Sequence, residues 1–594
     1  MKRVIAFLLL LVMTALVFVS CGKTKDADAT TAKETAAATT AKATTAGETA
    51  GETAGETTVA ATTTVPETTV DPFIAVGEEV KELSAANRNI KIQLSAFGNA
   101  EKVSKNDKYV AGPDSVEEGV TPEIQVMIYE RNRAANELLG TTVSYTYWSD
   151  LGWDKQWGRI ETLVKGQDPD SPDVFVDMIF DLGVATTKGL FKDLYSLPGS
   201  YFDFGADGWM DEWMDSMSLT GDRAYIMAGD YFLDVMRAMG VLPFNMTMMD
   251  ANAEALASAI LPAGESLAPG EELSARFFDF VEEGNWTWDT LTKLSAAIWK
   301  DEDDSGDDTI GDRLGFLGSG RTNMSSSLYL YSNGADLFDV VEHIEDPSSE
   351  YNGKRWIYYP DDPGVLGDMF DAIYALFDGK GTMAPNVENE GATPDNPGLA
   401  YHWIKFGEGG KTGTLFAGCC VLGALEDDAF QQMSDLYSVV PIPKLSTEGE
   451  YNTVIHNVGD AGAINVNTNP DKAKAISAFL QYCTENSGEI REEFLQIVTK
   501  YRTTVYNQGT DRMFNLIYSR IVDGRDKSIE DMMRKGNGTT NYRWHVLIMQ
   551  NNEYTHDSAF LATQYAAAKT AKQAYLDDLL ALWYTLPKVE PAAE

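Results

Sequence analysis

The chain has 594 residues, 44% of them hydrophobic and 11% aromatic, a composition ordinary for globular proteins. Its 90 acidic and 47 basic side chains give a formal net charge of −43 at pH 7. This acidic excess argues against nucleic-acid binding, which needs a basic face for the phosphate backbone, and against adsorption to anionic lipid headgroups.

The N-terminus has the pattern of an export signal. Sixteen mostly apolar residues, Val4–Val19, follow a basic pair and form a run shorter than a comfortable membrane helix. The stretch Phe18-Val19-Ser20-Cys21 resembles the bacterial lipoprotein signal, although Phe18 stands where leucine is usual. The resemblance implies that residues 1–20 are removed and that Cys21 is acylated, palmitate included, and anchors the protein to the extracellular face of the cell membrane. The alternative is an uncleaved anchor helix, and either places the rest outside the cytoplasm.

A tether is predicted after the signal, over residues 21–71. From about residue 23 to residue 69 it consists almost entirely of Thr, Ala, Glu, Gly and Lys, with a near-repeat at 45–57. Such a composition buries too little apolar surface to offset the entropy of ordering, so we expect disorder. A flexible tether of about fifty residues has a reach on the order of 40 Å.

Beyond residue 71, strand and helix patterns alternate. Strands are predicted at 89–95, 142–148 and 173–177, and helices at 124–139 and 157–166. This order predicts an α/β fold with a parallel sheet and crossover helices. Ligands of such sheets bind beyond the carboxyl ends of the strands, which points to Trp148 and Asp177.

Later segments add further helices and strands. They are a helix at 288–300 with Thr287 as N-cap, an apolar segment at 416–425, a segment at 436–440 that leads into Pro441-Ile442-Pro443, a strand at 461–466, and helices at 470–483 and 558–586.

Three cysteines lie beyond the tether, Cys419, Cys420 and Cys483. A bridge from one of the adjacent pair to Cys483 suits an exported protein. We favour buried free thiols that act as small apolar residues.

An acidic loop at 301–312 has the spacing of an EF-hand calcium loop, with glycine at the sixth position for the sharp turn. It departs from the pattern in having aspartate at the eighth position and aspartate instead of glutamate at the twelfth. The alternative is a solvated acidic turn, whose crowded carboxylates would repel one another without a cation. We favour a structural calcium site. Its predicted ligands are Asp301, Asp303, Ser305, the Asp307 carbonyl, Thr309 and Asp312.

Five segments beyond the tether occur in a recognisable order. They are Pro172-Asp173-Val174-Phe175 followed by Gly189–Leu194, Arg223–Asp230 as a crossover strand between lobes, Asn285–Leu291, Phe416-Ala417-Gly418 and Pro441-Ile442-Pro443. Together they resemble the extracellular solute-binding proteins of ABC importers, in the sugar-type family that includes maltose-binding protein. The third segment departs from the family pattern, because Asn285-Trp286 replaces the usual proline context.

The resemblance implies a two-lobed periplasmic-binding-protein-like fold of type II, whose hinge-linked lobes close on a ligand in the cleft between them. One lobe would contain residues 72–225 and about 410–455, and the other residues 226–409 and about 456–594. The implied function is a monomeric, lipid-anchored receptor that delivers a solute to an ABC permease. It would need no catalytic residue and no cofactor.

The same resemblance implies contacts to a mono- or oligosaccharide. Asp230 falls where sugar-binding relatives carry a hinge-region acid that accepts hydrogen bonds from hydroxyls, and Tyr231 follows it. Trp148 and Trp544 are candidates to stack on a pyranose, although most of the 12 tryptophans must be packing residues. Asp177 stands where some relatives have a stacking tryptophan, so that contact does not carry over.

Enzyme motifs are absent from the sequence. The five histidines show no metal-ligand spacing, and neither a nucleophile elbow nor a phosphate-binding glycine loop occurs. Two alternatives stay open: a tethered carbohydrate-active surface enzyme with paired carboxylates, and a receptor for a peptide or another non-sugar solute. The tryptophan content favours a sugar.

Overall fold

The computed structural model describes residues 72–95, 107–148, 155–318, 328–334, 338–361, 364–383, 401–418, 420–500, 508–521, 532 and 558–586. The expected signal and tether, Cys21, Cys419 and Trp544 lie outside these residues. Within them, no helix combines the length and the apolar character needed to cross a bilayer.

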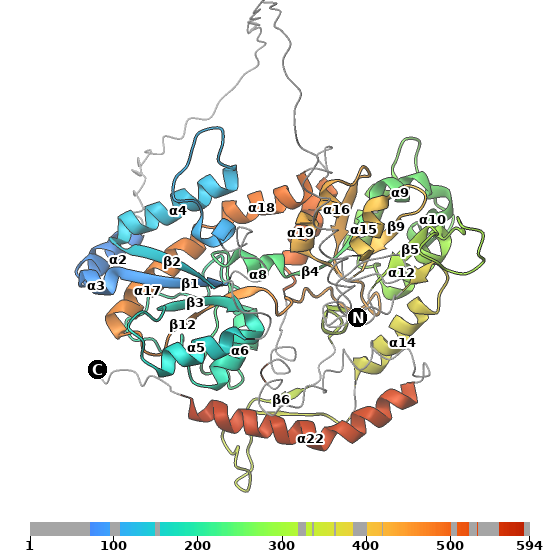
Figure 1. The fold of residues 1–594 in the computed structure, drawn as a ribbon. Helices are drawn as coiled ribbons and strands as arrows, with labels where there is room; N and C mark the ends of the chain where they lie inside the picture. The colour runs from blue at the N-terminus through green and yellow to red at the C-terminus, as the bar shows by residue number, and fades with distance from the viewer. Residues whose placement is uncertain are drawn as a thin grey trace, which may run out of the picture. The chain divides into compact units, whose positions relative to one another are not determined.

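The first sheet combines strands from early and late parts of the chain (Figure 1). Its order is β12-β3-β1-β2, built from β1 (Asn89–Ser95), β2 (Thr142–Trp148), β3 (Val174–Met178) and β12 (Asp460–Ile464). β1 pairs in parallel with β2 and β3, and β12 pairs with β3 in the antiparallel direction. The intervening helices α4 (Glu123–Leu139) and α5 (Gln156–Lys165) confirm the predicted strand–helix order, and the predicted boundaries of β1, β2, β3, α4 and α5 lie within one residue of the observed ones.

Local sequence explains these elements. The alternation along β1 places Ile90, Ile92 and Leu94 in the core, fully buried. α4 ends at Gly140, whose φ of 62° is a left-handed conformation that glycine adopts without strain.

The second sheet is also mixed. Its order is β10-β4-β9-β5-β8, from β4 (Gly240–Asn245), β5 (Leu314–Leu317), β8 (Thr382–Met383), β9 (Thr414–Ala417) and β10 (Cys420–Val421), and β11 (Tyr437–Val440) pairs with β4. β5 runs parallel to β8 and β9, whereas β4 is antiparallel to β9, β10 and β11. The described chain therefore has the expected α/β class, with two mixed sheets.

Helices and one hairpin complete the structure. The helices of the first half are α2 (Pro72–Lys81), α3 (Ala85–Arg88), η1 (Asp107–Ala111), α6 (Ile179–Thr187), α7 (Asp211–Ser216), α8 (Leu233–Arg237), α9 (Met246–Ala251), α10 (Ala253–Ile260), α11 (Leu273–Glu282) and α12 (Trp288–Ile298). Later elements are the hairpin β6 (Asp339–Val341) and β7 (Trp356–Tyr358), α14 (Val365–Phe377), α15 (Tyr401–Glu408), η2 (Leu422–Glu426), α16 (Asp428–Gln431), α17 (Pro470–Glu485), α18 (Gly488–Lys500), α19 (Gln508–Tyr518) and α22 (Ser558–Thr585). Thr287 caps α12 as predicted, because its side chain accepts a hydrogen bond from the Thr290 amide.

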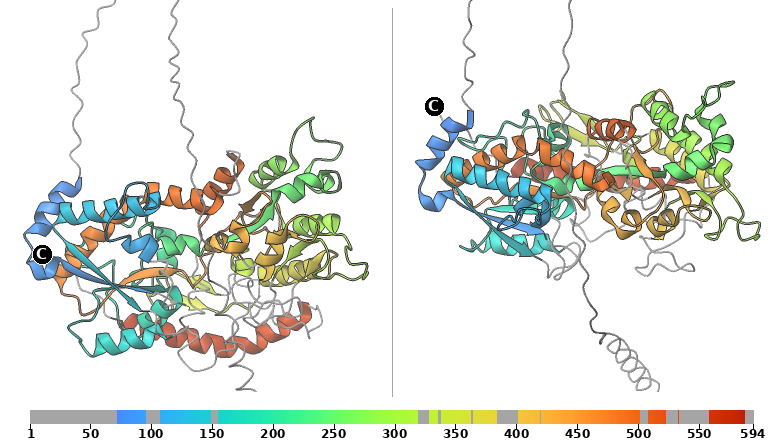
Figure 2. Two further views of the ribbon diagram at one scale, coloured as in Figure 1. Left: turned by 45° about the horizontal axis from the view of Figure 1, so that its top comes forward. Right: turned by 90° about the horizontal axis from the view of Figure 1, so that it is seen from above.

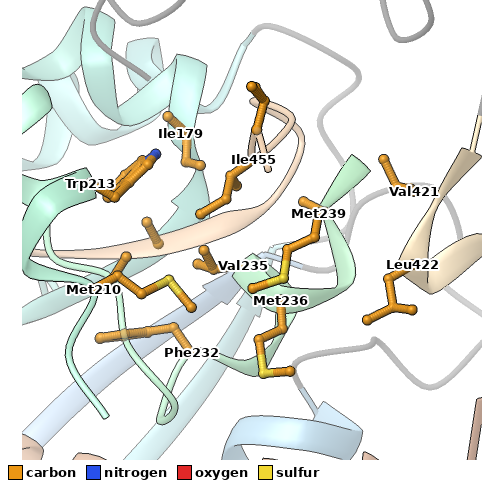
Figure 3. Close-up of a cluster of buried hydrophobic side chains, with 14 of the residues drawn as sticks. Ile179, Met210, Trp213, Phe232, Val235, Met236, Met239, Val421, Leu422 and Ile455 are labelled. Atoms are coloured by element: carbon orange, nitrogen blue, oxygen red, sulfur yellow. The ribbon is translucent and has the colours of Figure 1, made fainter. Parts of the chain in front are cut away.

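Two segments connect the sheets and lie side by side. The first leads from α8 into β4, and the second leads from β11 towards β12. They pair in the antiparallel direction at Met239 and Ile455, and the His456 amide donates to the Ala238 carbonyl at 2.8 Å. We call them the crossing segments, 238–240 and 454–456. Figure 3 shows Met239 and Ile455 among the buried apolar side chains around them.

The predicted division of the chain is wrong for its later segments. β9 and β11, within 410–455, pair in the second sheet, whereas β12 pairs with β3 in the first. α17 packs against α2 and α4, beside the first sheet. The reason is that the second crossing segment returns the chain to the first sheet just before β12.

The predicted position of the first crossing is also wrong. Residues 223–230 stay beside the first sheet, where Met227 pairs with Gly462. The chain reaches the second sheet only at Gly240, where β4 begins.

A buried ionic network lies next to the crossing segments. Arg237, 4% exposed, donates to Asp234 in α8 at 2.6 Å and to Glu426 in η2 at 2.8 Å. The hydroxyl of Tyr109, in η1, also donates to Glu426. Burial, together with the Glu426 charge, raises the pKa of Tyr109 far above its ordinary value, which keeps it a donor. One guanidinium therefore links three helices that belong to different parts of the chain.

Helix α12 and strand β5 approach so closely that only glycine fits at position 315. A β-carbon on Gly315 would overlap the backbone of Ser295. We expect Gly315→Ala to lower the free energy of unfolding by about 2 kcal/mol, because the helix must move away from the sheet. Gly367, inside α14, has open space around its β-carbon position. Gly367→Ala should stabilise by about 0.5–1 kcal/mol through helix propensity. Urea unfolding of both variants measures these two changes in the free energy of unfolding. Equal changes in the two variants would contradict the prediction.

Candidate functional site

Polar side chains gather where the strands of the first sheet end. Ser95 is paired in register with Trp148, and β3 ends one strand away at Asp177 and Met178. Asp181 follows in α6, four residues after Asp177. We call Gln93, Ser95, Asp177 and Asp181 the carboxyl-edge cluster.

Two carboxyl groups of this cluster are fully buried. Asp177 accepts hydrogen bonds from the Met178 amide at 2.9 Å and from the Gln93 side chain at 3.4 Å. Burial, and then the charge of Asp181, raise the pKa of Asp177 well above its ordinary value. Two buried acids in each other's field favour a proton on one of them, or a hydrogen-bond donor supplied from outside the protein.

Side-chain amides next to these acids lack partners among the described residues. The Gln93 carbonyl oxygen has none, and neither polar atom of Gln156 has one, although Gln156 is only 1% exposed. Gln156 begins α5 and precedes Trp157, whose backbone amide donates to Asp181 at 3.2 Å. Because buried polar groups are nearly always hydrogen-bonded, these atoms call for partners that the described residues do not supply, such as water or a ligand.

Sequence reasoning found part of this cluster. It selected Asp177 from its position at the end of a strand but missed Gln93, Gln156 and Asp181. Gln93 gave no signal, because the alternation of strand 89–95 places it with Lys91 on the face opposite the apolar residues, which is the face expected to be exposed. Gln156 gave no signal, because glutamine in the first turn of a helix is usually exposed.

Trp148 lies at the predicted edge, but its ring is packed. It is 5% exposed, and its centroid is 6.0 Å from that of Phe175. The guanidinium of Arg159 lies 4.4 Å from the ring centroid, so a cation covers one face. Stacking of Trp148 on a sugar stays a prediction.

Asp230 lies elsewhere, in a compact ionic trio. One carboxylate oxygen accepts from Arg491 of α18 at 2.7 Å and the other accepts from the Tyr518 hydroxyl of α19 at 3.0 Å. Burial raises the pKa of Asp230 to about 6, although Arg491 and Tyr518 oppose this. The trio ties the segment before α8 to two late helices. Contact of Asp230 with a ligand stays a prediction.

Tyr231 belongs to the core. It is fully buried, its hydroxyl lies 3.2 Å from that of Tyr145, and Arg131 lies over its ring at 4.8 Å. Asp177 and Trp148 thus both lie at the carboxyl end of the first sheet. Asp230 belongs to the ionic trio, and Tyr231 contacts Tyr145 of strand β2.

Among the cysteines, Cys483 is a buried free thiol, as expected. Burial raises its pKa to about 12, which makes the thiol unreactive.

Three of the six predicted calcium ligands of the acidic loop lie close together. Oxygens of Asp301, Asp303 and Asp312 all lie within 4.8 Å of one another. The Ser305 and Gly306 amides donate to Asp301 at 3.1 and 2.9 Å, which folds the loop around that carboxylate. Hydrogen bonds, first from the Thr309 side chain and then from Ser305, lower the pKa of Asp303 below its ordinary value.

Comparisons with known proteins give structural similarity alone. No family profile and no curated protein matches the chain. The structure is similar to the GacH receptor of Streptomyces glaucescens, at 13% identity and a TM-score of 0.43, covering 82% of this chain and 99% of that one. It is also similar to the ABC substrate-binding protein Lmo0181 of Listeria monocytogenes, at 12% identity and a TM-score of 0.43, covering 82% of this chain and 99% of that one. A third similar structure is the maltose/maltodextrin-binding domain MalE of Bdellovibrio bacteriovorus, at 11% identity and a TM-score of 0.41, covering 83% of this chain and 100% of that one.

The buried carboxyl of Asp230 predicts a pH effect on stability. Its pKa is about 6 in the folded protein and about 4 in an unfolded chain, so its contribution is fully present below about pH 4 and is lost as the pH rises through 6. Relative to Asp230→Asn, the wild type should therefore gain on the order of 2 kcal/mol between pH 7 and about pH 4.5. Urea unfolding of both proteins measures this difference. Tyr518→Phe, which keeps the carboxyl, should retain the pH dependence, and a pH-independent difference for Asp230→Asn would contradict the assignment.

Proposed function

We propose that this protein is a solute receptor of an ABC importer, and that its solute is a carbohydrate bound at the carboxyl-edge cluster. The observation that carries the proposal is that the Gln93 carbonyl oxygen and both polar atoms of Gln156 are buried without a partner among the described residues beside two buried carboxyl groups, at the edge where α/β sheets bind ligands. A solute with many hydroxyls meets both needs of the cluster, because hydroxyls donate to carboxylates and also satisfy amides.

The connection between the sheets supports a receptor that closes on its ligand. Two adjacent chain segments carry the crossing between the sheets, and rotation about such a pair opens or closes the space between two bodies. Closure would remove the solute from water and strengthen each polar contact.

A carbohydrate-active enzyme is the second candidate, because Asp177 is a buried acid with a raised pKa next to a second carboxyl group. Incubation with oligosaccharides separates the two. Product release that depends on Asp177 supports the enzyme, and binding without product supports the receptor.

Two further elements complete the proposal. Acylated Cys21 and the tether would hold the receptor at the extracellular face of the membrane, where the permease lies. Tethering raises the local concentration near the permease without a protein–protein contact. We also propose that the loop 301–312 binds one calcium ion of structural role, because three carboxylates converge there.

Replacement of Gln156 should separate binding from stability. Gln156→Leu removes a buried amide without partners, so we expect the free energy of unfolding to stay constant or rise by about 1 kcal/mol. The affinity for the best saccharide from a thermal-shift screen should fall about tenfold, since hydrogen bonds to the solute are lost.

Gln481 provides the matched control. It is also buried, but its carbonyl accepts from the Asp203 amide and the Trp209 indole at 2.9 and 3.0 Å. Gln481→Leu should therefore cost about 1–3 kcal/mol of stability and leave affinity unchanged. A Gln156→Leu protein that is destabilised but binds normally would refute the proposed role.

Calcium should raise the melting temperature of the wild type and EDTA should reverse the increase, because only the folded loop binds the ion. Asp301→Asn should abolish the response, whereas Asp289→Asn, in the exposed first turn of α12, should preserve it. Differential scanning fluorimetry with calcium or magnesium measures the shift. A wild type whose melting temperature calcium does not change would show that the loop is a solvated turn.

A further inference from the structure

A groove of about 980 Å³ lies between α4, strand β2 and the segment 111–114, and none of its lining residues belongs to the carboxyl-edge cluster. We call it the β2 groove. β2 is the last strand of the first sheet among the described residues, so the groove follows a sheet edge. Figures 1 and 2 show α4 on one side of this strand.

The groove is lined by a polar side of helix α4. The apolar side chains Ile124, Ile128, Ala135 and Leu139 of this helix are buried and are not part of the lining. The side that faces the groove carries Gln125, Tyr129 and Asn136. A polar lining with room for a ligand favours a role in binding.

Several of these polar groups are available to a ligand. The side-chain amide of Gln125 and the hydroxyl of Tyr129 make no hydrogen bond to another described residue. Asn136 uses its carbonyl oxygen, which accepts from Thr141 at 2.9 Å, so its amide nitrogen keeps two donors. Planar amides and a phenol can donate to and accept from neighbouring hydroxyls of one sugar ring.

Strand β2 supplies aromatic surface. Val143, Tyr145 and Tyr147 alternate along it and therefore point into the groove together. The hydroxyl of Tyr145 is held by that of Tyr231 at 3.2 Å, which fixes its ring. Tyr147 is 43% exposed, one of the few exposed large aromatic side chains of the described chain. Its ring is an accessible platform for an apolar sugar face.

The charges of the groove favour a neutral ligand. Arg133 is paired with Glu137 at 2.8 Å and also with Glu130, so its charge is compensated. Asp114 adds a carboxylate to the lining. An anionic ligand would meet repulsion there. An extended peptide would need apolar pockets for its side chains, and besides the aromatic rings the lining offers only Ala111, Pro113 and Val143.

We propose that the β2 groove is a second carbohydrate site, which binds a segment of a neutral polysaccharide. This proposal rests on the residues that line the β2 groove and does not depend on the proposed function of the carboxyl-edge cluster. Such a site would hold the receptor against the polymer from which its solutes are released.

Affinity electrophoresis in native gels that contain soluble starch, laminarin, xylan or mannan tests this proposal. At least one polysaccharide should retard the wild type, and Tyr147→Ala should weaken that binding at least about fivefold. Tyr147→Phe, which keeps the ring, should bind as the wild type does. Tyr195→Ala is the control, because Tyr195 is another exposed tyrosine, in the turn after β3 and α6.

The same gels with Gln156→Leu distinguish the two sites. Retention of binding in Gln156→Leu, with loss on Tyr147→Ala, supports a second site whether or not the first binds sugar. The proposal is overturned if no polysaccharide retards the protein or if Tyr147→Ala binds normally. It is also overturned if Gln156→Leu alone abolishes retardation, or if a synthetic peptide of residues 22–71 occupies the groove instead.

Discussion

The paired crossing segments are the constraint on which the structure depends. The hydrogen bonds between 238–240 and 454–456 hold an outgoing and a returning strand together where the chain passes from one sheet to the other. The buried Arg237 beside them is compensated by Asp234 and Glu426. Removing either acid would leave buried charge poorly paired, which costs more than an exposed pair contributes. The network therefore ties α8 and η2 together next to the crossing segments.

In the carboxyl-edge cluster, unlike in the ionic network beside the crossing segments, some buried polar atoms lack partners among the described residues. At the crossing every buried charge has a partner, whereas at the end of β1 and β3 the amides of Gln93 and Gln156 have unused hydrogen-bonding capacity. Under the proposed function, such a site costs stability in the absence of ligand and regains it on binding. A protein keeps this arrangement where binding matters more than the stability of the unbound state.

Local patterns predicted much of the fold because they act over a few residues. The alternation of Ile90, Ile92 and Leu94 located β1, and Thr287 located the start of α12. Pairings between distant residues were not predictable from such patterns, as with Asp230 and Arg491 or Asp177 and the amide of Gln93. The division of the later segments failed for the same reason, since nothing near β12 in the sequence specifies β3 as its neighbour. The candidate site was found at its strand end and missed where its groups come from a neighbouring strand or helix.

The position of β12 has a consequence for how the protein reaches its folded form. β3 acquires its outer neighbour only when Asp460–Ile464 arrives, after the whole second sheet has been made. During synthesis the early strands are made first and leave one edge of β3 unpaired, and an open edge invites pairing with another chain. Closing it requires a contact between distant parts of the sequence, which is slow. The interval before this closure is therefore when the emerging chain is most exposed to aggregation.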